Sequence, residues 1–445
     1  FYSRPLREKV WDGRYTGIRM CNELLENIDR VPDLDPELKK RYIGEAKVLR
    51  AYNYYELYTK FGDVPYTTKV LSIKESMSIA RTAKATVIAN VLADLDEVIN
   101  GNYLPTSYDA DNKGRITRWA AMAIKAKIYL FEGNWTQVKN ITSTIMTEGG
   151  FKLFGSYAGL FEIANEYNSE VILDAQYRPT SREHQMMYVF LPPTLGGYSQ
   201  LSPLQELVDS YIMLDGKTIK ETGTSFDESH PYANRDPRLK ATVMYTGNSY
   251  TLADGTEVVI NCEKGEGKDG YGVGSDCSAT GYYIKKYWDN TYRATLYSGL
   301  NPILIRYADI LLMNAEALAE LGELDKTAWD ATIKPIRDRA GFTLASALEF
   351  PEGASKDKLI EIVRNERRSE LALEGHRHKD IIRWRIADNV LNGWCHGLKT
   401  NDVVGTDDGY VRVENRTFNA NKHYLWPIPQ AERDLNGNLE QNPNW

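Results

Sequence analysis

The stretch ERRSELALEGHRHKDIIRW, from Glu366 to Trp384, decides how the whole chain is interpreted. Carboxylates and arginines recur in it at steps of three or four residues, so opposite charges can meet along one face of a helix. Gly375, in the middle of the run, indicates a junction between two helices. No recognisable catalytic motif accompanies the charges. The spacing therefore predicts a structural charge network that fixes the angle between two helices, rather than an active site.

The composition is typical of a soluble globular protein with more than one packed region. Of the 445 residues, 42% are hydrophobic and 26% are charged, and a chain of this length exceeds the size of an ordinary compact core. The formal net charge of -7 argues against nucleic acid or an acidic membrane surface as a partner. No run approaches the roughly 20 apolar residues that span a bilayer. We expect any targeting segment to lie upstream of Phe1.

The first part of the chain has the apolar spacing of helices. The clearest helix begins after Asp35, which is suited to cap it, with Pro36 as its first residue, and it stops at Gly62. The buried stripe expected on this helix includes Ala46 and Leu49.

Two helix hairpins with similar features lie far apart in the sequence. One turns at Gly133 and the other at Gly322, and small residues, Ala126 and Ala315, each stand seven positions before the turn. Small side chains let paired helices approach closely, and stacked pairs bury a face that one pair cannot cover. The pattern predicts tetratricopeptide-like helix pairs separated by an insertion.

The insertion differs from both flanks in composition. Residues 151–301 are rich in Gly, Pro, Tyr and Ser, and contain short strand-like pieces such as EVILDAQY and TEVVINC. We therefore divide the chain into a helical part, 1–150, a loop-rich part, 151–301, and a part of helices with an irregular tail, 302–445, all packed as one unit. The loop-rich part is the expected ligand-binding part, because loops on a rigid scaffold often carry binding residues.

Two short motifs resemble known sites but lack an essential part. GEGKDG, at Gly265 to Gly270, has the glycine spacing of a dinucleotide fingerprint, but a loop-like sequence follows it where a helix must open. Asp109 and Asp111 resemble the start of a calcium loop, but the twelfth position is Ala120 rather than a carboxylate. We expect neither a nucleotide nor a calcium ion to bind at these motifs.

The histidines and cysteines do not form a metal motif either. His376 and His378 stand two apart, so they point to different faces of a helix, and a packed or solvated role is favoured over zinc binding. Cys262 and Cys277 lie in a loop-like stretch where a disulfide is possible in an oxidising compartment, but spacing alone does not establish it. We expect no metal ion and no cofactor.

The opening stretch resembles the signature E-R-x-x-E-L-x-x-E-G-x-R-x-x-D-L-x-R-W of the SusD/RagB family, the outer-membrane nutrient-binding lipoproteins of Bacteroidetes. Ile381 replaces the usual leucine. Blocks such as GEAKVLRAYNYYELYTKFGDVPY, IRYADILLMNAEAL and the terminal YLWPIPQAERDLNGNLEQNPNW also look like family segments in the same order. The matching positions are Glu366, Arg367, Glu370, Leu371, Glu374, Gly375, Arg377, Asp380, Arg383 and Trp384.

The resemblance implies a fold, a place and a role. It implies a mostly α SusD-like fold in which tetratricopeptide-like pairs form a scaffold for an irregular region with short strands. It further implies a surface-exposed lipoprotein of the cell outer membrane that binds glycan without catalysis, for import through a SusC-like TonB-dependent transporter. The lipidated cysteine would lie upstream of Phe1, since Cys21 falls inside a helical pattern.

Ligand residues vary in this family, so the candidate site is argued from sugar chemistry. A sugar ring has apolar C–H faces and a rim of hydroxyls, which fit aromatic platforms beside polar side chains. In the loop-rich part these criteria select six residues: Tyr198, Tyr271, Trp288, Asn290, Tyr292 and Arg293.

Two alternatives remain open from the sequence. The chain could capture peptides or another nutrient in the same transport role, as the RagB branch implies. It could also be a glycoside hydrolase, because 61 acidic residues allow a pair of carboxylates at catalytic separation.

Overall fold

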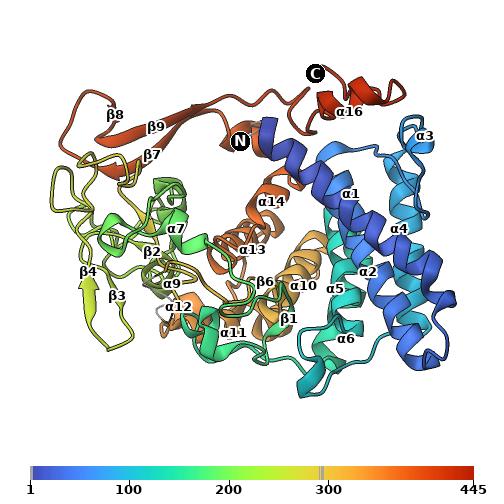
Figure 1. Cartoon of the computed structure of the whole chain (residues 1–445). Coiled ribbons are helices and arrows are strands. Elements are labelled where there is room, and N and C mark those ends of the chain that lie inside the picture. The colour runs from blue at the N-terminus through green and yellow to red at the C-terminus, as the bar shows by residue number, and fades with distance from the viewer. Residues whose placement is uncertain (1–3, 290, 292–294) are drawn as a thin grey trace. The chain divides into compact units, whose positions relative to one another are not determined.

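The computed structural model describes residues 4–289, 291 and 295–445 (Figure 1). Helices predominate and the strands are short, which confirms the prediction of a mostly α-helical fold. The chain forms two compact units. Unit 1 comprises Phe1–Gly149, His378–Leu391 and Phe418–Trp445, and unit 2 comprises Gly150–Arg377 and Asn392–Thr417.

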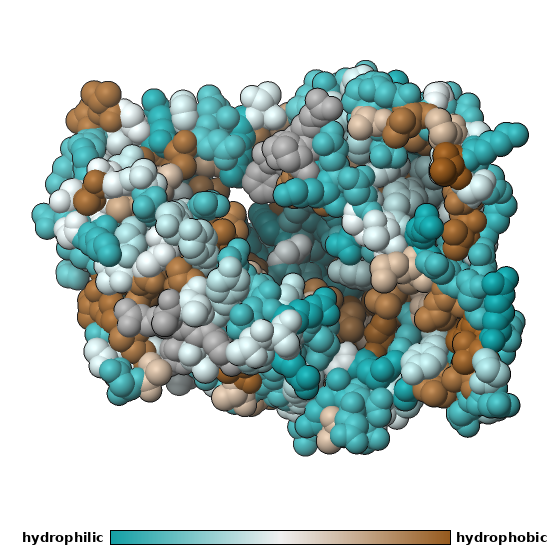
Figure 2. Space-filling view, in the orientation of Figure 1, coloured by the Kyte–Doolittle hydropathy of each residue, from teal (hydrophilic) through white to brown (hydrophobic). Residues whose placement is uncertain are grey.

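Unit 1 is built from helices, and α1 packs against α2, α2 against α4, and α4 against α5. In Figure 2, apolar residues of this unit gather at the surface over α1, α2 and α4. The helices of unit 1 in the described residues are α1 (Arg4–Asn27), η1 (Ile28–Arg30), α2 (Pro36–Phe61), α3 (Ile73–Ser76), α4 (Lys84–Asn100), η2 (Ala110–Asn112), α5 (Arg118–Phe131), α6 (Trp135–Glu148), α14 (Arg377–Arg383), α15 (Ala387–Val390) and α16 (Gln430–Leu435).

Helix α2 has the ends that its sequence predicts. The Asp35 side chain accepts a hydrogen bond from the backbone N–H of Leu38 at 2.8 Å, and Gly62 ends the helix with a φ of +72°. The expected stripe is partly wrong, because Ala46 is buried but Leu49 is 45% exposed. Since α2 packs against α1 on one side and α4 on another, its buried surface is broader than one stripe and is rotated away from Leu49.

Both predicted helix hairpins are present. Helix α5 packs against α6, and α10 (Tyr307–Leu321) packs against α11 (Lys326–Ala340) in unit 2. Gly133 and Gly322 turn the chain with φ values of +71° and +74°, a conformation that suits glycine. Ala126 and Ala315 are fully buried, as close helix approach requires.

Unit 2 combines helices with small antiparallel sheets. Strand β1 pairs with β6, β2 with β5 and β3 with β4, while β9 lies between β7 and β8. The predicted strand pieces EVILDAQY and TEVVINC contain β1 and β4. Beside α10 and α11, the elements are η3 (Gly159–Phe161), η4 (Ile163–Asn165), β1 (Val171–Asp174), α7 (Met186–Phe190), η5 (Pro193–Leu195), α8 (Gln205–Val208), α9 (Pro237–Thr242), β2 (Val243–Met244), β3 (Ser249–Thr251), β4 (Glu257–Val259), β5 (Tyr283–Ile284), β6 (Ile303–Arg306), α12 (Ala345–Leu348), α13 (Lys356–Glu370), β7 (Gly393–Lys399), β8 (Thr406–Asp407) and β9 (Tyr410–Arg416).

The core of unit 2 is unusually rich in tyrosine. Several of their hydroxyls are satisfied by neighbours, as is usual for a buried phenol. Tyr250 donates to the Ile284 carbonyl at 2.7 Å, and Tyr282 donates to the Gln205 side chain at 2.5 Å. Other buried members of this core include Tyr157, Phe161, Met187, Phe190, Tyr211, Tyr283, Leu300 and Leu398.

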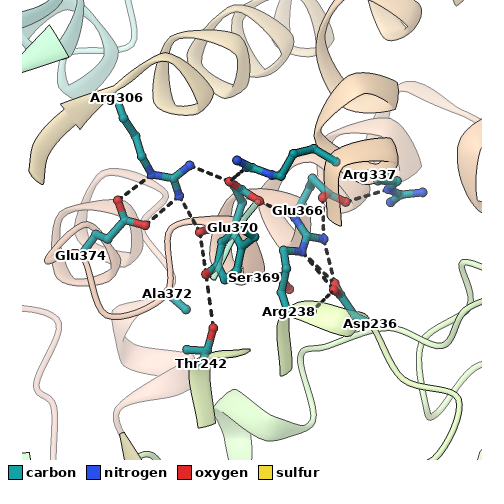
Figure 3. Close-up of polar contacts among 12 residues, drawn as sticks. Asp236, Arg238, Thr242, Arg306, Arg337, Glu366, Ser369, Glu370, Ala372 and Glu374 are labelled. Carbon is teal, nitrogen blue, oxygen red and sulfur yellow. Dashed lines mark hydrogen bonds and ion pairs between the residues drawn. The ribbon is translucent and has the colours of Figure 1, made fainter. Parts of the chain in front are cut away.

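The first half of the Glu366–Trp384 stretch lies at the centre of a buried charge network in unit 2 (Figure 3). Glu370 is fully buried and accepts hydrogen bonds from Arg306 at 2.6 Å, from Arg238 at 2.8 Å, and from Arg339. Arg306 reaches Glu374 with two nitrogens, at 2.8 and 2.7 Å. These arginines come from β6, α9 and α11, so one carboxylate joins three elements to α13.

The charge network extends on both sides of Glu370 and is balanced. Arg238 also contacts Asp236 at 2.7 Å and Glu366 at 2.7 Å, and Lys286 contacts Glu374 at 2.7 Å. Five cations thus face five carboxylates, which avoids an uncompensated buried charge. The ten residues are Arg238, Lys286, Arg306, Arg337, Arg339, Glu170, Asp236, Glu366, Glu370 and Glu374.

The predicted helix junction is confirmed, but the expected charge pairing is only partly correct. Helix α13 ends at Glu370, Gly375 has a φ of +79°, and α14 follows. Asp380 pairs with Arg383 within the stretch, at 2.9 Å. The buried glutamates instead pair with cations from other elements, because the side of α13 that carries them faces β6, α9 and α11 rather than solvent.

The charge network leads to a stability prediction. Replacement of Glu370 by glutamine keeps the volume of the side chain but leaves three buried arginines with one negative charge fewer. Because loss of one partner in a buried ion pair typically costs about 3–5 kcal/mol, we expect E370Q to lower the free energy of unfolding by that amount. Urea unfolding followed by circular dichroism measures it. The control is E361Q on the exposed side of α13, for which a change within about 0.5 kcal/mol is expected. Equal stability of E370Q and the native chain would contradict the assigned role.

The stability of unit 2 should also depend on pH. Burial alone would raise the pKa of Glu374, but Arg306 and Lys286 outweigh it and lower the pKa to about 2. A carboxyl in an unfolded chain has a pKa of about 4.3. The charged form therefore stabilises the fold above about pH 4.3, and this stabilisation is lost as the pH falls toward 2. Urea unfolding between pH 6 and pH 3 should show a fall in stability that is shallower in E374Q. Identical pH dependence in both proteins would refute this contribution.

Candidate functional site

Three tyrosines and a leucine of unit 2 are exposed on α7 and on neighbouring loops. The rings of Tyr188 and Tyr198 lie 4.4 Å apart between centroids at an interplanar angle of 32°. Tyr188, Tyr198 and Tyr297 are 37%, 39% and 41% exposed, whereas the other tyrosines that form the core of this unit are buried. Leu201 is also exposed. We call Tyr188, Tyr198, Tyr297 and Leu201 the tyrosine patch.

The loop after α7 returns Tyr198 to Tyr188 because of its glycines. Gly196 has a φ of +83°, and a Cβ at Gly197 would lie 2.1 Å from the Leu191 carbonyl oxygen. Only glycine fits such a close approach of two backbones. The returning chain is then fixed by the backbone N–H of Tyr198, which donates to the Tyr188 carbonyl at 3.0 Å. The sequence GGYSQ thus builds the paired rings.

A different backbone contact brings Tyr297 near Tyr188 and Tyr198. His184 and Ser298 exchange two backbone hydrogen bonds, at 2.9 and 3.0 Å, so Tyr297 lies beside the entry to α7. Hydrogen bonding with Tyr198 raises the pKa of Tyr188, and the nearby Asp276 and Tyr297 raise it further. The tyrosine patch therefore combines aromatic faces with phenol hydroxyls, and the exposed carboxylate of Asp276 lies near it.

The other sequence-selected residues have different surroundings. Trp288 donates its indole N–H to the Thr251 carbonyl at 2.9 Å, and its ring is 5.2 Å from that of Tyr250. Tyr271 packs against the core of unit 2 and is half-buried. The remaining candidates, Asn290, Tyr292 and Arg293, lie outside the described residues.

Sequence reasoning selected Tyr198 but passed over Tyr188 and Tyr297. The signal for Tyr188 was present in HQMMYVFLPPTLGGYSQL, because the paired glycines indicate a chain reversal that brings residues ten apart together. Tyr297 gave no local signal. Its place depends on the pairing of His184 with Ser298, which are separated by more than a hundred residues.

The short motifs set aside in the sequence are structural. Gly265 and Gly267 lie in turns without a following helix, and Asp109 caps η2 by accepting from the Asn112 N–H at 3.0 Å. His378 is packed beside Trp426 in unit 1, and burial lowers its pKa to about 4.

The thiols and acidic groups give no metal site in the part of the chain that the structure describes. Cys262 and Cys277 are free thiols, so the bridge that their spacing left open is not formed. Within residues 4–289, 291 and 295–445, no three His, Cys, Asp or Glu side chains are grouped so as to hold a metal ion. In the same residues, no helix has the length and apolar character needed to cross a membrane.

Comparisons with known proteins agree over almost the whole chain. A profile of the SusD family matches residues 160–445, and a profile described as starch-binding and associating with the outer membrane matches residues 6–130. A SusD-like protein of Formosa agariphila, P25, is 28% identical over 406 residues, which cover 86% of this chain and 71% of that protein.

Solved structures are similar as well. A SusD-like carbohydrate-binding protein from Bacteroides fragilis superimposes with a TM-score of 0.86 at 29% identity, covering 97% of this chain and 86% of that one. A second SusD-like protein from the same organism gives a TM-score of 0.84 at 28% identity, covering 99% of this chain and 86% of its own.

Proposed function

Because this chain belongs to the SusD family, we propose that it binds glycan without chemical change, and that the tyrosine patch of unit 2 is a contact site for the sugar. The observation that carries the proposal is the pair of exposed rings, Tyr188 and Tyr198, fixed in place by a glycine turn. A relative of similar fold, from Bacteroides fragilis, is described as carbohydrate-binding, which supports the ligand class.

The chemistry of the patch suits a sugar. Exposed aromatic faces attract the C–H faces of a pyranose ring, and phenol hydroxyls both donate to and accept from sugar hydroxyls. Because the loop is fixed by backbone bonds, little order has to be gained on binding, which favours affinity. Trp288 and Tyr271, which the sequence also selected, belong to the same proposal as further aromatic contacts of unit 2.

A binding role is favoured over hydrolysis by the groups that the patch offers. Hydrolysis of a glycosidic bond usually needs two carboxyl groups on opposite sides of the scissile bond. Among the described residues, Asp276 is a carboxylate whose charge raises the pKa of Tyr188. Glu166, Asp174 and Asp289 instead accept hydrogen bonds from Asn301 and Ser298, and Asp174 and Asp289 are buried.

The chain would also take part in import of the glycan. The bound glycan would pass to a SusC-like TonB-dependent transporter, with the chain anchored at the outer membrane by a lipid on a segment upstream of Phe1. The description of the matched family as associating with the outer membrane supports this location.

Glycan binding is tested with a panel of polysaccharides that includes laminarin, starch and pectin. We expect retarded migration of the native chain in affinity gels with at least one polymer, and no new reducing ends. Y188A and Y198A should each raise the dissociation constant about tenfold, or about 1.4 kcal/mol, whereas Y188F, which keeps the ring, should retain most of the affinity. W288A should also weaken binding if its ring is a platform.

The matched control is L344A, which removes an exposed apolar side chain of unit 2 at the start of α12. Circular dichroism of each variant confirms that the fold is intact. Undiminished affinity in Y188A and Y198A would remove the patch from the site. Binding of peptides alone would favour the nutrient alternative, and release of reducing ends would show an enzyme.

The role in import is tested by affinity purification of the full-length protein from detergent-solubilised outer membranes of its source bacterium. We expect mass spectrometry to identify a TonB-dependent transporter in near-equal amount. Recovery of the protein from the periplasmic fraction, or from the membrane without such a transporter, would contradict this part of the proposal.

A further inference from the structure

A second exposed aromatic side chain stands on the three-stranded sheet of unit 2. Of the nine tryptophans, all within the described part of the chain, Trp394 alone is exposed, at 42%. It lies on β7 opposite Asn415 of β9. The exposed part of this indole does not contribute to folding, because it remains in water. Packing in the core therefore does not explain why Trp394 is exposed on this sheet.

A row of ordered polar side chains begins at the Trp394 ring. The Arg412 guanidinium is 5.7 Å from the ring centroid, and its Nε donates to Asp407 at 2.9 Å. The other oxygen of Asp407 lies 3.0 Å from Nε2 of His396, whose Nδ1 lies 2.9 Å from Glu206. We call Trp394, Arg412, Asp407, His396 and Glu206 the tryptophan face.

The order of this row is fixed although its members are solvated. The His396 backbone N–H also donates to Glu206, at 3.1 Å, so β7 is attached to α8 twice. Burial alone would lower the pKa of His396, but its bonds to Asp407 and Glu206 outweigh it and raise the pKa. Exposed ion pairs of this kind add only about 0–1 kcal/mol to stability, so the row is not required for the fold.

The charges of the tryptophan face indicate the class of ligand. The charges of Asp407 and Glu206 are at least equal to those of Arg412 and His396, so the row has no net positive charge to attract a polyanion. An aromatic ring bordered by fixed donors and acceptors is suited to the C–H face and the hydroxyl rim of an uncharged sugar. Because each sugar hydroxyl can both donate and accept a hydrogen bond, it can pair with either kind of group in the row.

We propose that the tryptophan face is a second glycan-binding site, which contacts an uncharged segment of the same polymer whose other segment lies on the tyrosine patch. This inference rests on the proposed function. The two sites use different segments of unit 2, since the patch comes from residues 186–201 and 297 and the face from residue 206 and residues 394–412. A polymer long enough to reach both gains affinity, because the second contact is intramolecular.

The test compares long and short probes on the purified chain. The probes are the polysaccharide of the panel that binds and its tetrasaccharide, measured by isothermal titration calorimetry. W394A should raise the dissociation constant for the polymer about tenfold and leave that for the tetrasaccharide at the tyrosine patch unchanged, whereas Y188A should weaken both. The matched control is V403A, at the tip of the same sheet, where the side chain is 89% exposed without the polar row.

A direct readout accompanies the affinities. Because Trp394 is exposed, contact with a sugar should shift its emission to shorter wavelength. The shift that polymer causes should therefore be larger in the native chain than in W394F, which retains only the response of Trp288. Unchanged polymer affinity in W394A, with loss in Y188A, would overturn the second site and leave the proposed function standing. Absence of binding by the native chain would instead overturn the proposed function. Loss of transporter co-purification in W394A at full glycan affinity would assign the face to a protein partner, which also overturns this inference.

Discussion

The carboxylate of Glu370 is the interaction on which the rest of unit 2 depends. It is fully buried and is contacted by Arg238, Arg306 and Arg339, which belong to α9, β6 and α11. A buried charge in such a position is tolerable only when every charge around it is matched, because each unpaired ion costs several kcal/mol. The network therefore permits few arrangements of these elements other than the observed one.

The network also explains how irregular loops can present fixed side chains. Lys286 connects it to the Tyr157 hydroxyl at 3.0 Å and to the Ala372 carbonyl at 2.8 Å, and so joins the end of α13 to the tyrosine-rich core. The loops of the tyrosine patch extend from this core, with Met187 and Phe190 of α7 buried in it. Binding surfaces are commonly built in this way, from loops that are held by backbone hydrogen bonds and supported by a rigid interior.

Local features of the fold were predictable from the sequence. Helix ends at Asp35 and Gly62 and hairpin turns at Gly133 and Gly322 depend on residues within a few positions of each other. The structural nature of the Glu366–Trp384 stretch followed from spacing, but its partners did not. Arg306 and Glu370 are 64 residues apart, and Arg306 and Glu170 are 136 apart, so their contact depends on the tertiary fold.

The candidate site was predictable only in part for the same reason. Tyr198 stood out as an aromatic residue in a glycine turn, whereas Tyr297 joins it through backbone pairing across the insertion. Aromatic type alone did not indicate which rings are exposed. Trp288 met the chemical criterion but has its indole N–H bonded to Thr251, while Trp394, which lay outside the loop-rich part, is exposed.

The central claim is that glycan binds on the loops of unit 2 while the charge network remains unchanged as their support. Hydrogen–deuterium exchange of the native chain with and without saturating polysaccharide tests it most directly. The account predicts slower exchange in residues 186–201 and 295–298 on binding, with exchange in α13 unaltered. Protection confined to the helices of unit 1, or a general change across α13, would contradict it.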